Sequence, residues 1–275
     1  MSDSRPIGVF DSGLGGLTVV RELIKVMPNE DIVYFGDTGR VPYGTRSRET
    51  IIKYTRQDES FLLSRGVKLI IAACGTVSSV AAETGDELPV PFIEVVSHAS
   101  RRAAEETMNG KVGVIATPAT IASGSYKKRI EAINSEIQVY GNECPLFVPI
   151  VEAGWIDRND AVAIETAKRY LAPLKEKGVD TLILGCTHYP VITDIIRDVM
   201  GNGVKLINPG EHTAKAAKKY IEENSLQNEK NEQGKHQYFV SDRTESFSKT
   251  ASILMGHPIK ESVTRVDIDN IKELF

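Results

Sequence analysis

The sequence lacks the usual features of secreted, membrane-spanning and nucleic-acid-binding proteins. It has only three cysteines, an odd number that does not make a disulfide framework. It has no apolar run long enough to cross a bilayer, and its first expected strand, residues 7–10, begins too early to follow a signal peptide. A net charge of −4 argues against a nucleic acid or an acidic membrane as the main partner. We therefore expect a cytoplasmic protein with reduced cysteines.

The composition is that of a folded globular protein. The 275 residues are 41% hydrophobic and 25% charged, and this length allows one large or two small domains. Strands and helices alternate almost throughout, which predicts an α/β fold of mainly parallel sheets covered by helices. We expect a helix over about 47–65, a polar, solvated connection over 225–235, and a strand at 238–240 before a final helix that contains Phe247 and Leu254.

An internal repeat indicates that the chain has two similar halves. The segment 6–12 resembles the segment 111–117, and Cys74 and Cys186 follow at nearly the same spacing. Two similar α/β lobes follow from this pattern. Because open parallel sheets bind ligands at the carboxyl ends of their strands, we expect the site in the cleft between the lobes.

The two cysteines of this repeat are candidate acid/base groups. Cys74 and Cys186 each end an apolar strand, and the polar residues Gly75-Thr76 and Thr187 follow them. A thiol at a helix start has a stabilised anion, and its ordinary pKa of about 8.5 is close to neutrality. A thiol and a thiolate on opposite sides of one carbon can remove a proton from one face and return one to the other. Cys144 is instead expected to be a small buried residue.

Three further residues are candidate helpers of these thiols. Asp11 ends the first strand, His188 lies two residues beyond Cys186, and Glu152 is an acid in an apolar run, where its pKa should be raised. Each also has a structural interpretation. Asp11 could cap a helix, His188 could be a core histidine, and Glu152 could lie in a solvated loop.

Other kinds of site fit the sequence less well. The glycine-rich turn 11–16 has neither the GxGxxG spacing nor the Gly-Lys-Ser/Thr ending of a phosphate-binding loop. Cys186 and His188 lack a second ligand pair, so no metal site is expected. A thiol hydrolase would leave the second strand-end cysteine unexplained. No lysine stands out as a Schiff-base candidate, and we expect no cofactor.

The chain resembles the glutamate racemases, cofactor-independent isomerases of the aspartate/glutamate racemase superfamily. The resemblance rests on five blocks in the right order, at residues 8–16, 41–44, 72–74, 148–152 and 184–190. It implies two α/β lobes related by pseudo-twofold symmetry, with the active site in the cleft between them. Residues 1–97 and 208–275 would form the first lobe and residues 98–207 the second.

The resemblance also implies roles for the candidate residues. Cys74 would take the α-proton of D-glutamate, assisted by Asp11, and Cys186 that of L-glutamate, assisted by Glu152 and His188. The D-glutamate would feed peptidoglycan synthesis, which builds the cell wall and sets cell shape. Besides glutamate, the expected partner is a second copy of the chain, and neither nucleic acid nor membrane is expected. The implied substrate contacts are Asp11, Ser12, Pro42, Tyr43, Gly44, Gly75, Thr76, Thr187 and His188.

One residue departs from the family pattern. Gly75 stands where the family usually has asparagine, so a side-chain contact to the substrate is lost, while the backbone N–H remains and a water can fill the gap. Two alternatives stay open. The chain could be a related racemase that acts on aspartate or a hydantoin, or a non-catalytic module that binds acidic ligands. The presence of both Cys74 and Cys186 argues against the second alternative.

Overall fold

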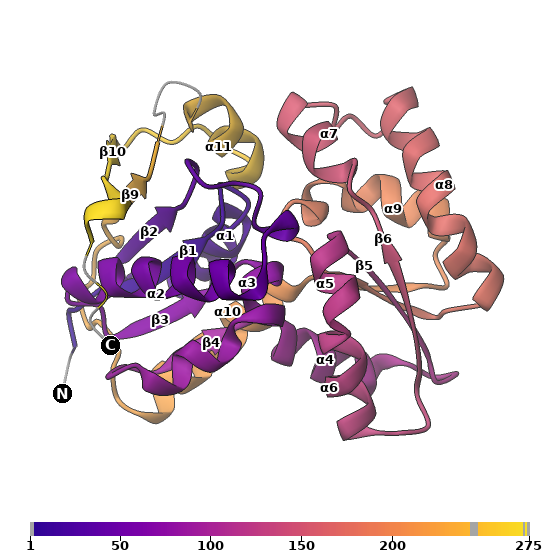
Figure 1. Cartoon of the computed structure of the whole chain (residues 1–275), viewed down its shortest axis with the longest axis horizontal. Helices are drawn as coiled ribbons and strands as arrows, with labels where there is room; N and C mark the ends of the chain where they lie inside the picture. Colours follow the sequence, from indigo (N-terminus) through magenta and orange to yellow (C-terminus); the bar gives the residue numbers. More distant parts are fainter. Residues whose placement is uncertain (1–2, 243–246, 272, 274–275) are drawn as a thin grey trace.

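The chain forms two lobes, each a parallel sheet covered by helices. The computed structural model describes residues 3–242, 247–271 and 273. In Figure 1 the two sheets lie side by side, with one lobe drawn mainly in indigo and yellow and the other in magenta and orange. The predicted α/β class with two lobes is therefore confirmed.

The first lobe is built on a sheet of six strands within the described residues, and every pair in it is parallel. These strands are β1 (Ile7–Asp11), β2 (Ile32–Gly36), β3 (Leu69–Ala72), β4 (Phe92–Glu94), β9 (His236–Val240) and β10 (Val263–Arg265). Their order across the sheet is β10-β9-β2-β1-β3-β4. The central strands are apolar along their whole length because both faces of a parallel sheet are covered.

Helices cover both faces of this first sheet. Helix α1 packs on the side of Val9, and α2 packs on the opposite side, where Phe10 points. The predicted helix over about 47–65 is α2, and Ser47 caps it by accepting the N–H of Thr50 at 3.3 Å. The helical segments of this part of the chain are α1 (Leu17–Val26), η1 (Tyr43–Thr45), α2 (Arg48–Ser64), α3 (Gly75–Val80), η2 (Ala82–Glu87), α10 (Pro209–Glu223), α11 (Phe247–Met255) and η4 (Ile268–Asn270).

The second sheet repeats the central order of the first. Its described strands are β5 (Lys111–Ala116), β6 (Gln138–Glu143), β7 (Thr181–Leu184) and β8 (Lys205–Ile207). They lie in the order β6-β5-β7-β8, which matches β2-β1-β3-β4 strand for strand. The predicted internal repeat is therefore confirmed, and β3 and β7, after which Cys74 and Cys186 follow, are equivalent strands. Its helical segments are α4 (Val95–Glu106), α5 (Pro118–Ser123), α6 (Ser125–Ile133), α7 (Phe147–Ala153), α8 (Ala161–Lys177), η3 (Tyr189–Ile192) and α9 (Thr193–Met200).

Helix α10 connects the two lobes, because it packs on both α1 and α4. The lobe boundaries predicted from the sequence, at residues 97/98 and 207/208, stay a prediction, and the first of them falls within α4. The predicted first lobe also includes residues 1–2, 243–246, 272 and 274–275, which lie outside the described residues.

One sequence-based expectation about the end of the chain was wrong. The helix that contains Leu254 is not the last element, because β10 and η4 follow it. The polar segment 225–235 is mostly exposed and connects α10 to β9, as expected, although its start makes contacts with the first lobe. The buried Lys68 places its Nζ 2.6 Å from Glu30 Oε2 and donates to the carbonyl of Leu226 at 2.7 Å. Asn228 N–H donates to Glu30 at 2.8 Å, so the start of the segment is anchored to the first lobe.

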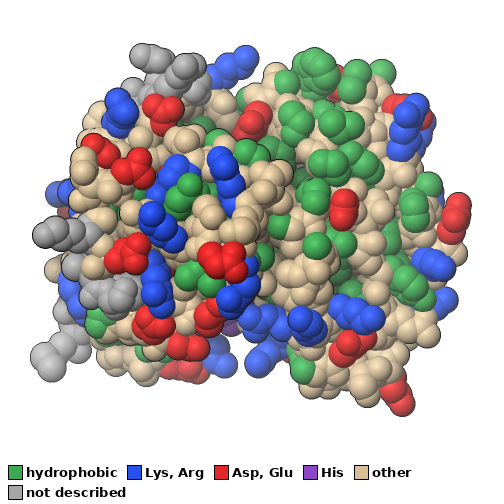
Figure 2. Space-filling model, in the orientation of Figure 1, with side chains coloured by type: hydrophobic (Ala, Val, Ile, Leu, Met, Phe, Trp, Pro, Cys, Tyr) green, Lys and Arg blue, Asp and Glu red, His purple; other side chains and the backbone are tan. Residues whose placement is uncertain are grey.

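The surface of the second lobe is partly apolar. Figure 2 shows apolar side chains gathered over this lobe, while side chains of both charges cover much of the first lobe in the same view. Leu146, Trp155 and Val162 are each about half exposed. No helix in the described ranges is both long and apolar enough to cross a membrane.

Candidate active site

The carboxyl ends of the two sheets meet at one pocket of about 460 Å³. The volume is within the range of about 300–1,000 Å³ that is typical of small-molecule sites. Both Cys74 and Cys186 line it, as does every other site residue predicted from the sequence. The lining residues are Asp11, Ser12, Gly13, Leu14, Val41, Pro42, Tyr43, Gly44, Thr45, Cys74, Gly75, Thr76, Thr117, Pro118, Pro145, Val148, Pro149, Glu152, Gly185, Cys186, Thr187 and His188.

Cys74 is held at the first-lobe wall of this pocket. It directly precedes α3, is only 4% exposed, and donates its thiol hydrogen to Ser12 Oγ at 3.3 Å. Burial, reinforced by the nearby carboxylate of Asp11, raises the pKa of the Cys74 thiol to about 12. The help from a helix start that the sequence predicts is therefore outweighed by burial, and Cys74 is a neutral thiol at neutral pH.

Asp11 lies beside Cys74 because β1 and β3 are neighbouring strands. Its carboxylate accepts the N–H of Gly13 at 3.0 Å. Burial raises the pKa of Asp11, while the charge of His188, the N–H groups of Gly16 and Gly13, and a hydrogen bond from Cys74 act in the opposite direction. The pKa of Asp11 therefore depends both on Cys74 in its own lobe and on the charge of His188 in the other lobe.

Cys186 belongs to a chain of three groups in the second lobe. Its Sγ lies 3.9 Å from His188 Nδ1, and His188 Nε2 lies 3.1 Å from Glu152 Oε1. Burial alone would lower the pKa of His188, but hydrogen bonds and charge interactions with Cys186 and Glu152 outweigh it and raise that pKa to about 10. His188 is therefore an imidazolium beside Cys186 at neutral pH.

Glu152 differs from the sequence-based expectation. It lies near the end of α7, and its side chain is 47% exposed rather than enclosed by apolar groups. Cys144 is fully buried and does not line the pocket, as predicted. Burial raises its pKa to about 12.

Tyr43 lines the pocket, but its hydroxyl is engaged elsewhere. The side chain is buried, and the hydroxyl donates to Asp37 and to Asp58, the latter at 3.1 Å. Arg40 Nε donates to the same Asp37 carboxylate at 2.6 Å. This buried network fixes η1, so Pro42 and Gly44 form a firm wall of the pocket.

Thr117 is a pocket residue that the sequence analysis missed. Its Oγ1 lies 3.2 Å from Thr76 Oγ1, across the two lobes. The signal was present, because the repeat aligns the segment 111–117 with 6–12 and thus Thr117 with Ser12, which also lines the pocket. Pro145, Val148 and Pro149 contribute an apolar wall that was not predicted, although Val148 and Pro149 lie in the block 148–152 that carries the family resemblance.

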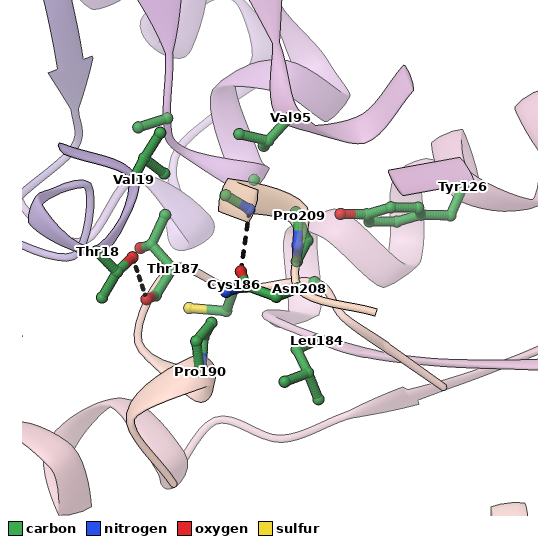
Figure 3. Close-up of a pocket in the computed structure, with 14 residues that line it drawn as sticks. Thr18, Val19, Val95, Tyr126, Leu184, Cys186, Thr187, Pro190, Asn208 and Pro209 are labelled. Carbon is green, nitrogen blue, oxygen red and sulfur yellow. Dashed lines mark hydrogen bonds between the residues drawn. The ribbon is translucent and has the colours of Figure 1, made fainter. Parts of the chain in front are cut away.

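A second, much smaller cavity lies behind Cys186 (Figure 3). Its volume of about 10 Å³ is about that needed for a single water molecule. Here Thr18 of the first lobe donates its hydroxyl to the carbonyl of Thr187 at 2.8 Å, drawn as a dashed line in Figure 3. Among the described residues, no three His, Cys, Asp or Glu side chains gather as a metal site would require.

Comparison with known proteins identifies the family. A model of the Asp/Glu/Hydantoin racemase family matches residues 15–217. The glutamate racemase of Geobacter metallireducens is 45% identical over 270 residues, which are 98% of this chain and 99% of that protein. The crystal structure of Francisella tularensis glutamate racemase with D-glutamate matches with a TM-score of 0.90 and 39% identity, covering 97% of this chain and 99% of that one. The Thermus thermophilus glutamate racemase structure, with β-chloro-D-alanine, matches with a TM-score of 0.87 and 38% identity, covering 98% and 99%. The chain therefore belongs to the Asp/Glu/Hydantoin racemase family.

Proposed function

We propose that this chain is a glutamate racemase that interconverts L- and D-glutamate without a cofactor. The observation that carries the proposal is that two cysteines from equivalent strands of the two lobes line one pocket. The relatives named above, similar over nearly their whole length, support glutamate as the substrate.

The reaction needs only the two thiols as proton carriers. In the L-to-D direction, the Cys186 thiolate takes the α-proton, and the electron pair of the broken C–H bond stays on the α-carbon. The Cys74 thiol then gives its proton to the opposite face of that carbon. D-glutamate, a Cys74 thiolate and a Cys186 thiol result, and the reverse direction uses the same groups with exchanged roles.

The electrostatics of the pocket give the two thiols different starting states. The raised pKa of Cys74 keeps it protonated, so it starts as the acid. The imidazolium of His188 stabilises the Cys186 thiolate, and Glu152 holds that imidazolium in place. In the substrate-free protein Cys186 is therefore ready to act as the base on L-glutamate. The charge of Asp11 helps to keep Cys74 protonated.

The pocket recognises an acidic amino acid without a lysine or arginine among its described lining residues. Strand-end N–H groups and hydroxyls would bind the carboxylates, and the Asp11 carboxylate would attract the α-ammonium group. The same donors, in a pocket that excludes water, would stabilise the charge that develops on the α-carbon. The hydroxyls available are those of Ser12, Thr45, Thr76, Thr117 and Thr187.

Isotope exchange on single enantiomers tests this function. The purified protein in heavy water should convert L- or D-glutamate into the opposite enantiomer, with deuterium at the α-carbon of the product at early times. Cys74→Ala and Cys186→Ala should each abolish the interconversion, whereas Cys144→Ala should retain it. Racemisation of aspartate but not glutamate would reject the substrate, and an active Cys74→Ala variant would reject the two-thiol mechanism.

We also propose that the protein is a cytoplasmic homodimer that supplies D-glutamate for peptidoglycan. The apolar surface of the second lobe, with the half-exposed Leu146, Trp155 and Val162, supports self-association. The free thiols support a reducing compartment. Sedimentation equilibrium should give twice the chain mass, and the monomer mass would reject the dimer.

A further inference from the structure

A proline removes one hydrogen-bond donor from the turn 186–191, which follows the last strand before the pocket in the second lobe. In a tight helical turn, a carbonyl accepts the N–H of the residue three positions later. The carbonyls on either side of Thr187 do so, because they accept the N–H groups of Tyr189 and Val191, each at 3.1 Å. The carbonyl of Thr187 cannot, because the residue three positions later is Pro190, which has no N–H.

A donor for this carbonyl comes from the other lobe. Thr18, in α1 of the first lobe, donates its hydroxyl to the carbonyl of Thr187 at 2.8 Å (Figure 3). The same hydroxyl lies 2.9 Å from the carbonyl of Gly15, but that carbonyl already accepts the N–H of Thr18 at 3.0 Å. Thr18 is only 2% exposed, so the bond between the lobes is shielded from solvent. Thr18 thus supplies the hydrogen bond that Pro190 cannot.

The start of α1 also fits closely against the side chains of this turn. At Gly15, directly before α1, an added Cβ would overlap Thr187 Oγ1 and lie 2.6 Å from His188 Nδ1. The hydroxyl of Thr18 and this close fit lie within one turn of the chain in the first lobe. Together they hold residues 187–188 against the first lobe.

The hydrogen bond from Thr18 bears on the charged groups of the site. The peptide unit that joins Thr187 to His188 is planar, so a fixed carbonyl also fixes the direction in which the backbone enters His188. The ring of His188 lies 3.9 Å from Cys186 Sγ through Nδ1 and 3.1 Å from Glu152 Oε1 through Nε2. Both distances depend on the orientation of that peptide unit.

We propose that Thr18 is a positioning residue that holds Cys186 and His188 in place by giving the turn 186–191 the hydrogen bond that Pro190 withholds. The inference rests on the proposed function, because only a reaction that uses the Cys186 thiol depends on where this turn lies. Displacement of a reacting group by about 1 Å can cost about a hundredfold in rate. Thr18→Val keeps the shape of the side chain without its hydroxyl, and we expect it to lower kcat by about tenfold to a hundredfold in both directions.

The test restores the missing donor at its local position. Pro190→Ala gives residue 190 an N–H that can donate to the carbonyl of Thr187. The loss of kcat caused by Thr18→Val should therefore shrink to less than about threefold in a Pro190→Ala background. A general weakening of the contact between the lobes would instead cost the same factor in both backgrounds.

Two control variants separate the hydroxyl of Thr18 from other effects. Thr18→Ser keeps a hydroxyl donor and should keep kcat within about twofold of wild type. Thr193→Val removes a hydroxyl that donates to the carbonyl of Pro190 at 2.8 Å within the second lobe, so it disturbs the same turn without touching the bond between the lobes. It should also keep kcat within about twofold of wild type.

Amide hydrogen exchange measured by NMR keeps the test independent of activity. The N–H groups of Tyr189 and Val191 close the turn, so they should exchange about tenfold faster in Thr18→Val and at the wild-type rate in Thr18→Ser. A wild-type kcat in Thr18→Val would overturn the inference, as would an equal loss of kcat with and without Pro190→Ala. If exchange changes as expected but the wild-type protein does not racemise glutamate, the proposed function fails instead.

Discussion

Replacing Asp11 with asparagine tests how the protein shares one proton between its two thiols. In the substrate-free pocket, burial and the Asp11 carboxylate keep Cys74 protonated. In the proposed reaction Cys186, whose Sγ lies 3.9 Å from His188 Nδ1, starts as the base. Since Cys74 must be a thiolate before it can deprotonate D-glutamate, this arrangement favours binding of L-glutamate.

The size of the effect follows from simple electrostatics. Two like charges about 4 Å apart repel by about 4 kcal/mol at the effective dielectric constant of about 20 that suits protein sites. Asp11→Asn removes that repulsion, which favours the neutral Cys74 thiol. Even a third of this energy moves the balance about tenfold toward the Cys74 thiolate.

The measurement compares KM for the two enantiomers. L- and D-glutamate have equal free energies in water, so kcat/KM must be the same in both directions for every variant. A shift of the proton between the thiols therefore appears in KM and kcat separately. We expect the ratio of KM for D-glutamate to KM for L-glutamate to fall about tenfold in Asp11→Asn, with the kcat ratio falling equally.

Initial rates followed by circular dichroism from each pure enantiomer give these constants. The equality of kcat/KM in the two directions is an internal control on the data. A KM ratio within twofold of the wild-type ratio would refute the idea that Asp11 holds the proton on Cys74.

Three further predictions concern the charged groups. Glu152→Gln keeps an oxygen that can accept a hydrogen bond from His188 but removes the negative charge beside it, so the pKa of His188 should fall from about 10. Because Glu152 is half exposed, solvent limits the fall to less than about one unit in an NMR titration of the histidine ring. An unchanged pKa would contradict the charge interaction between Glu152 and His188. His188 has a folded pKa of about 10 against about 6.5 when unfolded, so its contribution to stability is complete below about pH 6.5 and is lost as the pH rises through about 10. Urea unfolding should show this loss in wild type, and a His188→Gln variant with the same pH slope would disprove it. Lys68→Met leaves Glu30 buried without its cation and should lower the free energy of unfolding by about 3–5 kcal/mol. Lys53→Met, on the exposed side of α2, is the control and should change the free energy of unfolding by less than about 0.5 kcal/mol. Equal effects of the two substitutions would show that the Lys68–Glu30 ion pair does not stabilise the fold.

The position of the site was predictable because topology and short-range order determine it. Cys74 and Cys186 end equivalent strands, and parallel strands of one sheet bring Asp11 beside Cys74. His188 lies only two residues after Cys186, so its ring falls near that thiol. These relations follow from the order of the strands in each sheet and from short spacing along the chain, and they do not require knowledge of how individual side chains pack.

Features that depend on tertiary packing were not predictable. The raised pKa of Cys74 reflects burial that only the folded lobes produce, and the hydroxyl of Tyr43 turns to Asp37 and Asp58 rather than to a substrate. Strands β4, β8 and β10 have three residues each, too few for a periodic pattern to show. The exposed position of Glu152 likewise depends on where α7 ends.

The order of strands along the chain has a consequence for synthesis on the ribosome. All four strands of the second sheet emerge before β9 and β10, which only extend the outer edge of the first sheet beside β2. The core β2-β1-β3-β4 and the whole of the second sheet can therefore assemble on the nascent chain. A polypeptide released before β9 would already hold both thiols, yet it would leave one edge of β2 open to pairing with other chains.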